Sequence, residues 1–242
     1  MKADVVTITA DEWCPYNCNK EDVNKGFLVD IFTHIFKKAG HEVEYSISSS
    51  YEKAIKDVRK NKIDALIGTY QEEVPDFVFP KSAIAYSYDI MLINEDSTWT
   101  YQSEDSLNEL CIGVVKDYEY EEPIKSHISK YKNNSNKIHM ISGNNSLDYN
   151  LKKLRYHKIT ALVDDQLLIQ YYQAKTKKAF HFKVAKRFDD YPLYIAFSPN
   201  NYKSKEYATV LNRGLRKLKG SPELAKILAK YGLTEKDILQ PQ

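Results

Sequence analysis

The chain has 242 residues, which is enough for one large domain or for two of about 120 residues each. Its 35 basic and 33 acidic residues leave a net charge of +2, which is too balanced to predict a nucleic-acid or membrane surface. No stretch approaches the roughly 18 apolar residues of a membrane-spanning helix. The first residues also lack the apolar core of a signal peptide, so we expect that an export signal was removed before Met1.

The first third of the chain alternates between strand and helix patterns. The predicted order is strand 5–9, helix 27–39, strand 41–47, helix 51–60 and strand 65–67. Gly40 supplies the end of the first helix, and the serines at 48–50 offer an N-cap for the second. This β-α-β-α-β order predicts a doubly wound unit with a parallel sheet.

The stretch 63–80 is where a ligand is most readily expected. Gly68 and Thr69 end its apolar run, and ligands of open α/β sheets bind at the carboxyl ends of strands. Polar residues follow, and then a loop punctuated by Pro75 and Pro80. An ordinary strand-to-loop junction would show the same pattern. This stretch alone therefore does not distinguish a ligand site from such a junction.

The second half predicts another α/β unit after a strand at 88–94 and a polar interval at 95–105. Its predicted elements are helix 106–110, strand 111–115, helix 121–130, strand 138–141, helix 147–157, strand 160–163 and helix 166–173. A strand at 191–199 and helices 204–219 and 222–231 complete the chain. We therefore expect two α/β lobes joined by two crossing segments, with residues 1–94 plus 193–242 in lobe 1 and 95–192 in lobe 2.

Two of the three cysteines, Cys14 and Cys18, are four residues apart in a proline-containing loop. This spacing permits a small disulfide in an oxidising compartment, two free thiols or a metal site. No histidine lies nearby, so the metal signal is weak. The disulfide is the favoured hypothesis if the protein is exported.

Several segments resemble the type II periplasmic solute-binding proteins of the amino-acid-binding kind, the bacterial extracellular solute-binding protein family 3. The similar segments are 11–16, 26–31, 62–68, 106–113, 159–165, 194–197 and 227–232. Segments 13–18 and 74–80 resemble a less characterised branch of that superfamily. The resemblance implies two Rossmann-like lobes that close on a small polar ligand, as in a Venus flytrap.

The resemblance also implies ligand-binding positions. From lobe 1 they are Asp11, Trp13, Tyr51, Thr69, Tyr70 and Gln71, and from lobe 2 they are Lys116, Tyr118, Tyr120 and Asp165. In the family, the carboxylate at the position of Asp165 receives an α-ammonium group, and an aromatic wall stands at the position of Tyr51. The alternatives are structural: Asp165 as a helix N-cap, Trp13 in the core, Tyr51 as a staple, and Lys116 and Tyr120 facing water.

One departure from the family concerns the ligand. The family's carboxylate-binding arginine is missing from the loop at 71–76, where Glu72 and Glu73 stand instead. This loop cannot form a bidentate arginine–carboxylate pair. Either Lys116 substitutes for the arginine, or the ligand is cationic or lacks a carboxylate.

The expected function is that of a periplasmic receptor for a small nitrogen-containing solute, an amino acid or amine. We expect the receptor to be a monomer that presents this solute to an ABC permease in the inner membrane. A ligand-sensing domain of a signalling receptor is the alternative, and a dehydratase-like enzyme comes below it. We expect no catalytic activity and no cofactor, because the sequence has no nucleophile motif, H-E-x-x-H motif or phosphate-binding glycine loop. No nucleic-acid partner is expected.

Overall fold

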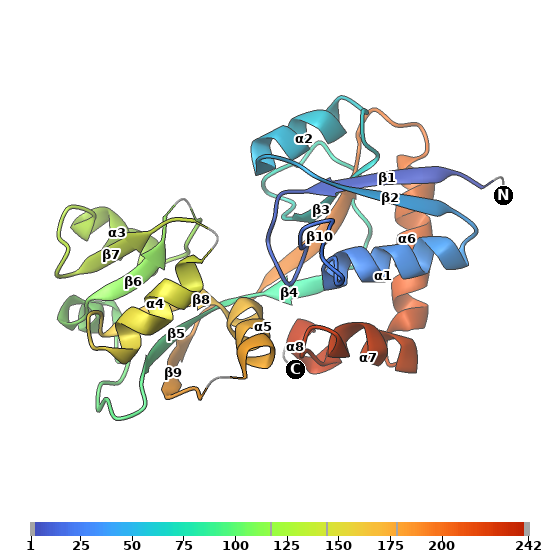
Figure 1. The fold of residues 1–242 in the computed structure, drawn as a ribbon. Helices are drawn as coiled ribbons and strands as arrows, with labels where there is room; N and C mark the ends of the chain where they lie inside the picture. Colours follow the sequence, from blue (N-terminus) through green and yellow to red (C-terminus); the bar gives the residue numbers. More distant parts are fainter. Residues whose placement is uncertain (1–2, 117, 144, 178, 240–242) are drawn as a thin grey trace. The chain divides into compact units, whose positions relative to one another are not determined.

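A computed structural model describes residues 3–116, 118–143, 145–177 and 179–239 (Figure 1). The chain divides into two compact units. Unit 1 comprises Met1–Ser87, Gln170–Lys175 and Asp190–Gln242, and unit 2 comprises Tyr88–Ile169 and Thr176–Asp189. Each unit is built on its own five-stranded sheet. None of the helices in the described ranges is long and apolar enough to cross a membrane.

The sheet of unit 1 has the strand order β2-β1-β3-β10-β4. Its strands are β1 (Val5–Ala10), β2 (Glu42–Ile47), β3 (Ala65–Thr69), β4 (Ala85–Ser87) and β10 (Tyr191–Phe197). The first three are parallel, as the sequence predicts, whereas β10 runs antiparallel between β3 and β4. The helices are α1 (Phe27–Lys38), α2 (Tyr51–Arg59), α6 (Ser204–Leu218), α7 (Pro222–Ala229) and α8 (Glu235–Ile238).

Helix α1 is the centre of the unit 1 core because one apolar face of it is fully enclosed. Phe32 and Phe36 stack with a centroid distance of 4.0 Å, and both rings lie near Phe197 of β10. The N-cap of the helix is Gly26, whose N–H donates a 2.9 Å hydrogen bond to the hydroxyl of Tyr231. The start of α1 is therefore held both by its apolar face and by the segment that follows α7.

The sheet of unit 2 has the strand order β7-β6-β8-β5-β9. Its strands are β5 (Asp89–Asn94), β6 (Ile112–Val115), β7 (Ile138–Ile141), β8 (Ala161–Asp165) and β9 (Phe182–Arg187). Strands β6, β7 and β8 are parallel, and β5 is antiparallel to both β8 and β9. The helices are the 3₁₀ helix η1 (Glu104–Glu109), α3 (Ile124–Tyr131), α4 (Ser146–Arg155) and α5 (Gln166–Thr176).

The expected division of the chain differs from the observed one at both crossings. The first boundary falls after Ser87 rather than after residue 94, because β5 pairs with β8 and β9 in the sheet of unit 2. The second boundary, at which the chain returns to unit 1, falls at Asp190 rather than at 193. Residues Gln170–Lys175 of α5 also group with unit 1. Strands β4 and β9 and helix α8 are not among the elements expected from the sequence. The first has only three residues, and β9 carries Val184 with 54% exposure, so its apolar pattern is weak.

Candidate functional site

The carboxyl ends of β1 and β3 bring most of the residues expected from lobe 1 together within unit 1. We name this set edge 1: Asp11, Trp13, Tyr51, Thr69, Tyr70 and Glu73. The Tyr51 hydroxyl lies 2.8 Å from Thr69 Oγ1 and donates a hydrogen bond to the Glu73 carboxylate. The backbone N–H of Tyr70 also donates to Glu73, at 3.3 Å. Gln71, which the resemblance also implies, is exposed beyond the strand end.

Edge 1 is acidic. Burial raises the pKa of Asp11, and the neighbouring carboxylates of Glu52 and Glu73 raise it further. No basic side chain in the described part of the chain forms an ion pair with Asp11. A positively charged ligand group would relieve this repulsion, whereas a ligand carboxylate would add to it.

The loop after β1 packs directly against the end of β3. Trp13 stacks on buried Tyr16 with the ring centroids 3.9 Å apart, and Asn17 Nδ2 donates a 2.6 Å hydrogen bond to the carbonyl of Asp11. Gly68 has a φ of +71°, and a Cβ there would lie 3.0 Å from Asn17 Oδ1 and 3.8 Å from the Trp13 ring. Trp13 is thus partly core and partly exposed beside Gly68.

The same loop is closed by a disulfide between Cys14 and Cys18, which confirms the favoured hypothesis. Replacing both cysteines by alanine is expected to lower the free energy of unfolding by ~2 kcal/mol, because the closed loop is short. Urea unfolding with and without reductant measures the effect. Reductant should destabilise the native protein but leave the double variant unchanged.

The matched control for this prediction is Cys111→Ala, since Cys111 is a free thiol. This variant should keep the sensitivity to reductant. Equal unfolding free energies for the native protein and the Cys14/Cys18 variant would show that the disulfide contributes nothing to stability.

Unit 2 presents a second acidic set where β8 ends and the antiparallel β5 begins. We name it edge 2: Asp89, Asp164 and Asp165. Asp89 and Asp165 are directly paired in the β5–β8 ladder. Asp165 Oδ1 accepts hydrogen bonds from the backbone N–H groups of Leu167 at 2.8 Å and Leu168 at 3.0 Å. The helix-capping role considered from the sequence is therefore present, at the same edge of the sheet at which the resemblance implies ligand binding.

Two carboxyl groups of edge 2, those of Asp89 and Asp164, have raised pKa values. Burial, followed by the charges of Asp165 and Glu121, raises the pKa of Asp89 to about 7. Burial also raises the pKa of Asp164 well above its usual range. Asp164 Oδ1 accepts a 2.9 Å hydrogen bond from the N–H of Asp165, and its Oδ2 has no hydrogen-bond partner among the described residues.

The three residues expected in the loop after β6 lie in different surroundings. Lys116 is exposed, and its backbone N–H donates a 2.7 Å hydrogen bond to the carbonyl of Ile141. Tyr118 is 42% exposed. Tyr120 is only 5% exposed, its hydroxyl accepts a 2.8 Å hydrogen bond from the N–H of Val115, and its ring belongs to the core of unit 2. Tyr120 therefore supports the end of β6 from within the core.

The sequence did not indicate Asp89 of edge 2 or Arg187, which lies on the neighbouring strand β9. Asp89 opens β5, and the guanidinium of Arg187 lies 3.9 Å from the centre of the Tyr88 ring. One signal for Asp89 was available, because it is an acidic residue at the start of an otherwise apolar strand. Arg187 ends β9, which the apolar pattern did not reveal.

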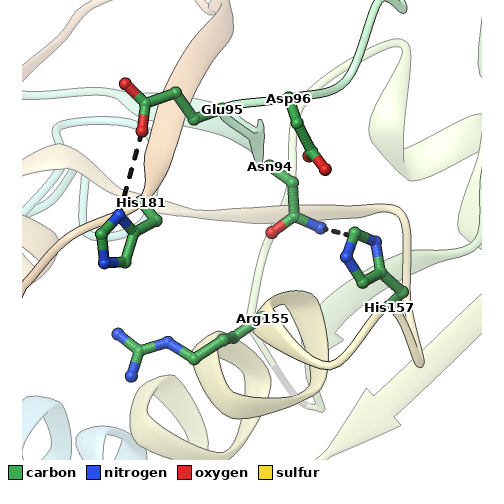
Figure 2. A pocket seen from close by; sticks show the side chains of 6 residues that line it. All are labelled: Asn94, Glu95, Asp96, Arg155, His157 and His181. Atoms are coloured by element: carbon green, nitrogen blue, oxygen red, sulfur yellow. Dashed lines mark hydrogen bonds and ion pairs between the residues drawn. The ribbon is translucent and has the colours of Figure 1, made fainter.

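A separate pocket lies at the far end of β5 from Asp89 (Figure 2). It is lined by Asn94, Glu95, Asp96, Arg155, His157 and His181. The His181 ring nitrogen Nδ1 lies 3.9 Å from the Glu95 carboxylate, and Arg155 donates a 2.7 Å hydrogen bond to the carbonyl of Ala179. Apart from Asn94, these side chains are exposed and of both charge signs, so the pocket shows no preference for one class of ligand.

A model of the bacterial extracellular solute-binding proteins, family 3, matches residues 5–234. A comparison with curated proteins gives no match.

Among solved structures, the chain is similar to substrate-binding domain 2 of GlnP from Lactococcus lactis in its open conformation. The TM-score is 0.69 with 19% identity, covering 96% of each chain. It is also similar to an ancestral arginine-binding protein bound to arginine, with a TM-score of 0.64 and 20% identity over 96% of this chain and 99% of that chain. The chain is similar as well to a mutant of ArgBP from T. maritima, with a TM-score of 0.62 and 17% identity over 95% of each chain. These likenesses show the two-lobed fold of type II periplasmic binding proteins.

Proposed function

Because the chain belongs to the bacterial extracellular solute-binding proteins, family 3, we propose that it captures a small, polar, nitrogen-containing solute for ABC-type transport. It acts outside the cytoplasm, in the periplasm, and as a monomer that hands the solute to a permease in the inner membrane. The family consists of binding proteins, so no chemical step is assigned to it.

The observation that supports a nitrogen-containing solute is the charge of the two edges. Edge 1 carries Asp11 and Glu73, and edge 2 carries Asp89 and Asp165, so an ammonium or guanidinium group finds carboxylates on either unit. Trp13 and Tyr51 supply apolar walls for the carbon chain, and Thr69, Tyr70 and Gln71 supply polar contacts. Lys116 and Tyr118 contribute from the surface of unit 2, and Tyr120 contributes through the core.

The test of this function uses pairs of probes that differ only by an α-carboxylate: L-arginine and agmatine, L-ornithine and putrescine, L-lysine and cadaverine. A probe at about 100 times its dissociation constant stabilises the protein by ~2.7 kcal/mol, which a thermal shift detects. We expect the amine of at least one pair to stabilise the protein as strongly as its amino acid, because the 71–76 loop offers no arginine to a carboxylate.

The control for this test is Lys116→Ala. Stabilisation by an amino acid but not by its amine would contradict the expectation and would show that a carboxylate is recognised. Loss of that stabilisation in Lys116→Ala would then identify the cation that replaces the family arginine. Absence of stabilisation by solutes of any charge would contradict the proposed function itself.

A further inference from the structure

Basic residues are concentrated in one continuous part of unit 2. The net charge of the chain is only +2, but residues 125–158 carry eight lysines and arginines against the single acid Asp148. The preceding stretch, 95–122, has the opposite balance, with nine acidic residues against the single base Lys116. The basic stretch includes most of α3 and all of β7 and α4. The balanced charge of the whole chain therefore conceals a separation of signs within unit 2.

Helix α4 presents a stripe of this basic stretch on the side that faces away from its own sheet. The helix packs on β5, β6 and β8 through a face that buries Leu151 and Leu154 (Figure 1). Tyr149, Lys152 and Tyr156 follow one another at intervals of three and four residues, so they lie in one line on the opposite face. The two tyrosines are 52% and 69% exposed, which is unusual for such large rings.

Lys152 stands between the two tyrosines of this stripe. Its ammonium lies 5.5 Å from the centre of the Tyr149 ring and 2.5 Å from the carboxylate of Asp148. More than half of the Lys152 side chain is still open to solvent. Arg155 of the same helix does not belong to the stripe, because it lines the pocket of Figure 2 together with Glu95.

More positive charge lies beside the stripe. Lys153 reaches to β7 and contacts His139 Nε2. Burial raises the pKa of Cys111, whereas the charges of Lys137 and Lys153 lower it, so both lysines lie near this residue. We name the surface that they flank the α4 face, and it consists of Tyr149, Lys152, Lys153 and Tyr156.

The α4 face combines two features with which a protein surface binds an anionic bilayer. Lysines attract the headgroup phosphates, and a tyrosine places an apolar ring at the lipid boundary with its hydroxyl among the headgroups. Tyr149 and Tyr156 are two helical turns apart, about 10 Å along the axis, so both rings can meet the same plane. A convex helix face of this kind suits an extended surface better than an enclosed small ligand.

We propose that unit 2 docks through the α4 face onto the anionic phospholipid headgroups of a bilayer. The tyrosines lie at the level of the headgroups, and the lysines contact their phosphates. The inference goes beyond the proposed function, which requires a solute but no lipid. The choice of a bilayer over a soluble acidic partner rests on that function, because the solute is handed over at a membrane.

The test is sedimentation of the full chain with vesicles, without any solute. The protein should bind vesicles of phosphatidylcholine that contain about 30% phosphatidylglycerol, and it should not bind vesicles of phosphatidylcholine alone. Binding should weaken when the salt concentration rises from about 0.05 M to about 0.5 M, because the screening length shortens.

Lys152→Glu reverses one charge of the α4 face and should lower the partition coefficient about thirtyfold. The matched control is Lys53→Glu on α2. The Lys53 side chain is 57% exposed and that of Lys152 55%, and each lysine pairs with an aspartate at i,i+4 spacing. The control changes the net charge and the helix by the same amount, so it should lower the coefficient by no more than about threefold.

Replacing Tyr149 and Tyr156 together by serine keeps the charge and should weaken binding about tenfold, because no ring then leaves the water. Tyr202→Ser is the control for the loss of an exposed ring. Tyr202 is 89% exposed and belongs to unit 1, so its replacement should leave the partition coefficient unchanged.

Equal binding to both kinds of vesicle, or no binding to either, would overturn the proposal. Equal losses in Lys152→Glu and Lys53→Glu would also overturn it, because net charge alone would then explain the attraction. Binding to poly-L-glutamate but not to the anionic vesicles would make an acidic protein the partner of the α4 face. None of these measurements contains a solute, so their failure leaves the proposed function to its own test.

Discussion

Replacing Gly26 by alanine is expected to lower the free energy of unfolding by more than ~3 kcal/mol. Gly26 has a φ of +108°, which L-residues rarely adopt, and a Cβ there would lie 2.3 Å from the carbonyl oxygen of Tyr16 and 2.5 Å from Asn17 Cα. These are backbone atoms, so no side-chain rotation relieves the overlap. A shift of residue 26 would also stretch its hydrogen bond to Tyr231.

Gly40→Ala separates backbone strain from steric overlap. Gly40 has a φ of +89°, but a Cβ there would meet nothing within 4 Å. Its replacement by alanine should therefore cost only ~1 kcal/mol, the cost of the unusual φ alone. Urea denaturation of both variants gives the two values. Equal losses would show that the loop around Tyr16 yields to the added methyl group, contrary to this expectation.

Replacing Asp165 by asparagine is expected to weaken binding of the most stabilising cationic probe by about thirtyfold or more, which is ~2 kcal/mol. The asparagine retains an oxygen that can accept the N–H groups of Leu167 and Leu168, so the cap of α5 survives. The fold should stay intact while the charge that attracts the solute is lost. Calorimetric titration measures the affinity, and urea unfolding checks the stability.

Asp165→Ala tests the capping role of the same residue. It removes both hydrogen bonds to α5, so it should lower the free energy of unfolding by ~1 kcal/mol in addition to weakening binding. If Asp165→Asn binds the probe as tightly as the native protein does, then Asp165 serves only as a helix cap. The acidic character of edge 2 would then have to act through Asp89 alone.

Much of the fold could be predicted from the sequence because most core elements carry strong apolar periodicity. Helix α1 buries one continuous stripe, and β3 and β8 are short apolar runs bounded by polar residues. The boundary expected at Asn94 differs from the division into compact units, because apolar periodicity identifies a strand but not its partners. Only the pairing of β5 with β8 and β9 places it in unit 2.

The residues of the candidate site that lie at strand ends could be predicted from the sequence. The burial of its side chains, which depends on packing, could be predicted only in part. Thr69 follows from the position at which β3 ends, and the family resemblance implies Asp11 and Asp165, which lie at the ends of β1 and β8. Tyr120 shows the limit, because a tyrosine in a polar loop gives no sign that its ring is enclosed by the core. The place of Asp89 at edge 2 depends on its pairing with Asp165, a contact between residues 76 positions apart in the chain.

The strand order of unit 1 also determines the order in which the protein can assemble. Strand β10 lies between β3 and β4, yet its residues follow the whole of unit 2 in the chain. During synthesis the N-terminus of the chain emerges first. The edge of β3 therefore stays exposed until residues 191–197 are available to pair with it. Every strand of unit 2 has been synthesised by then. Unit 1, which begins the chain, is therefore the last to complete its sheet.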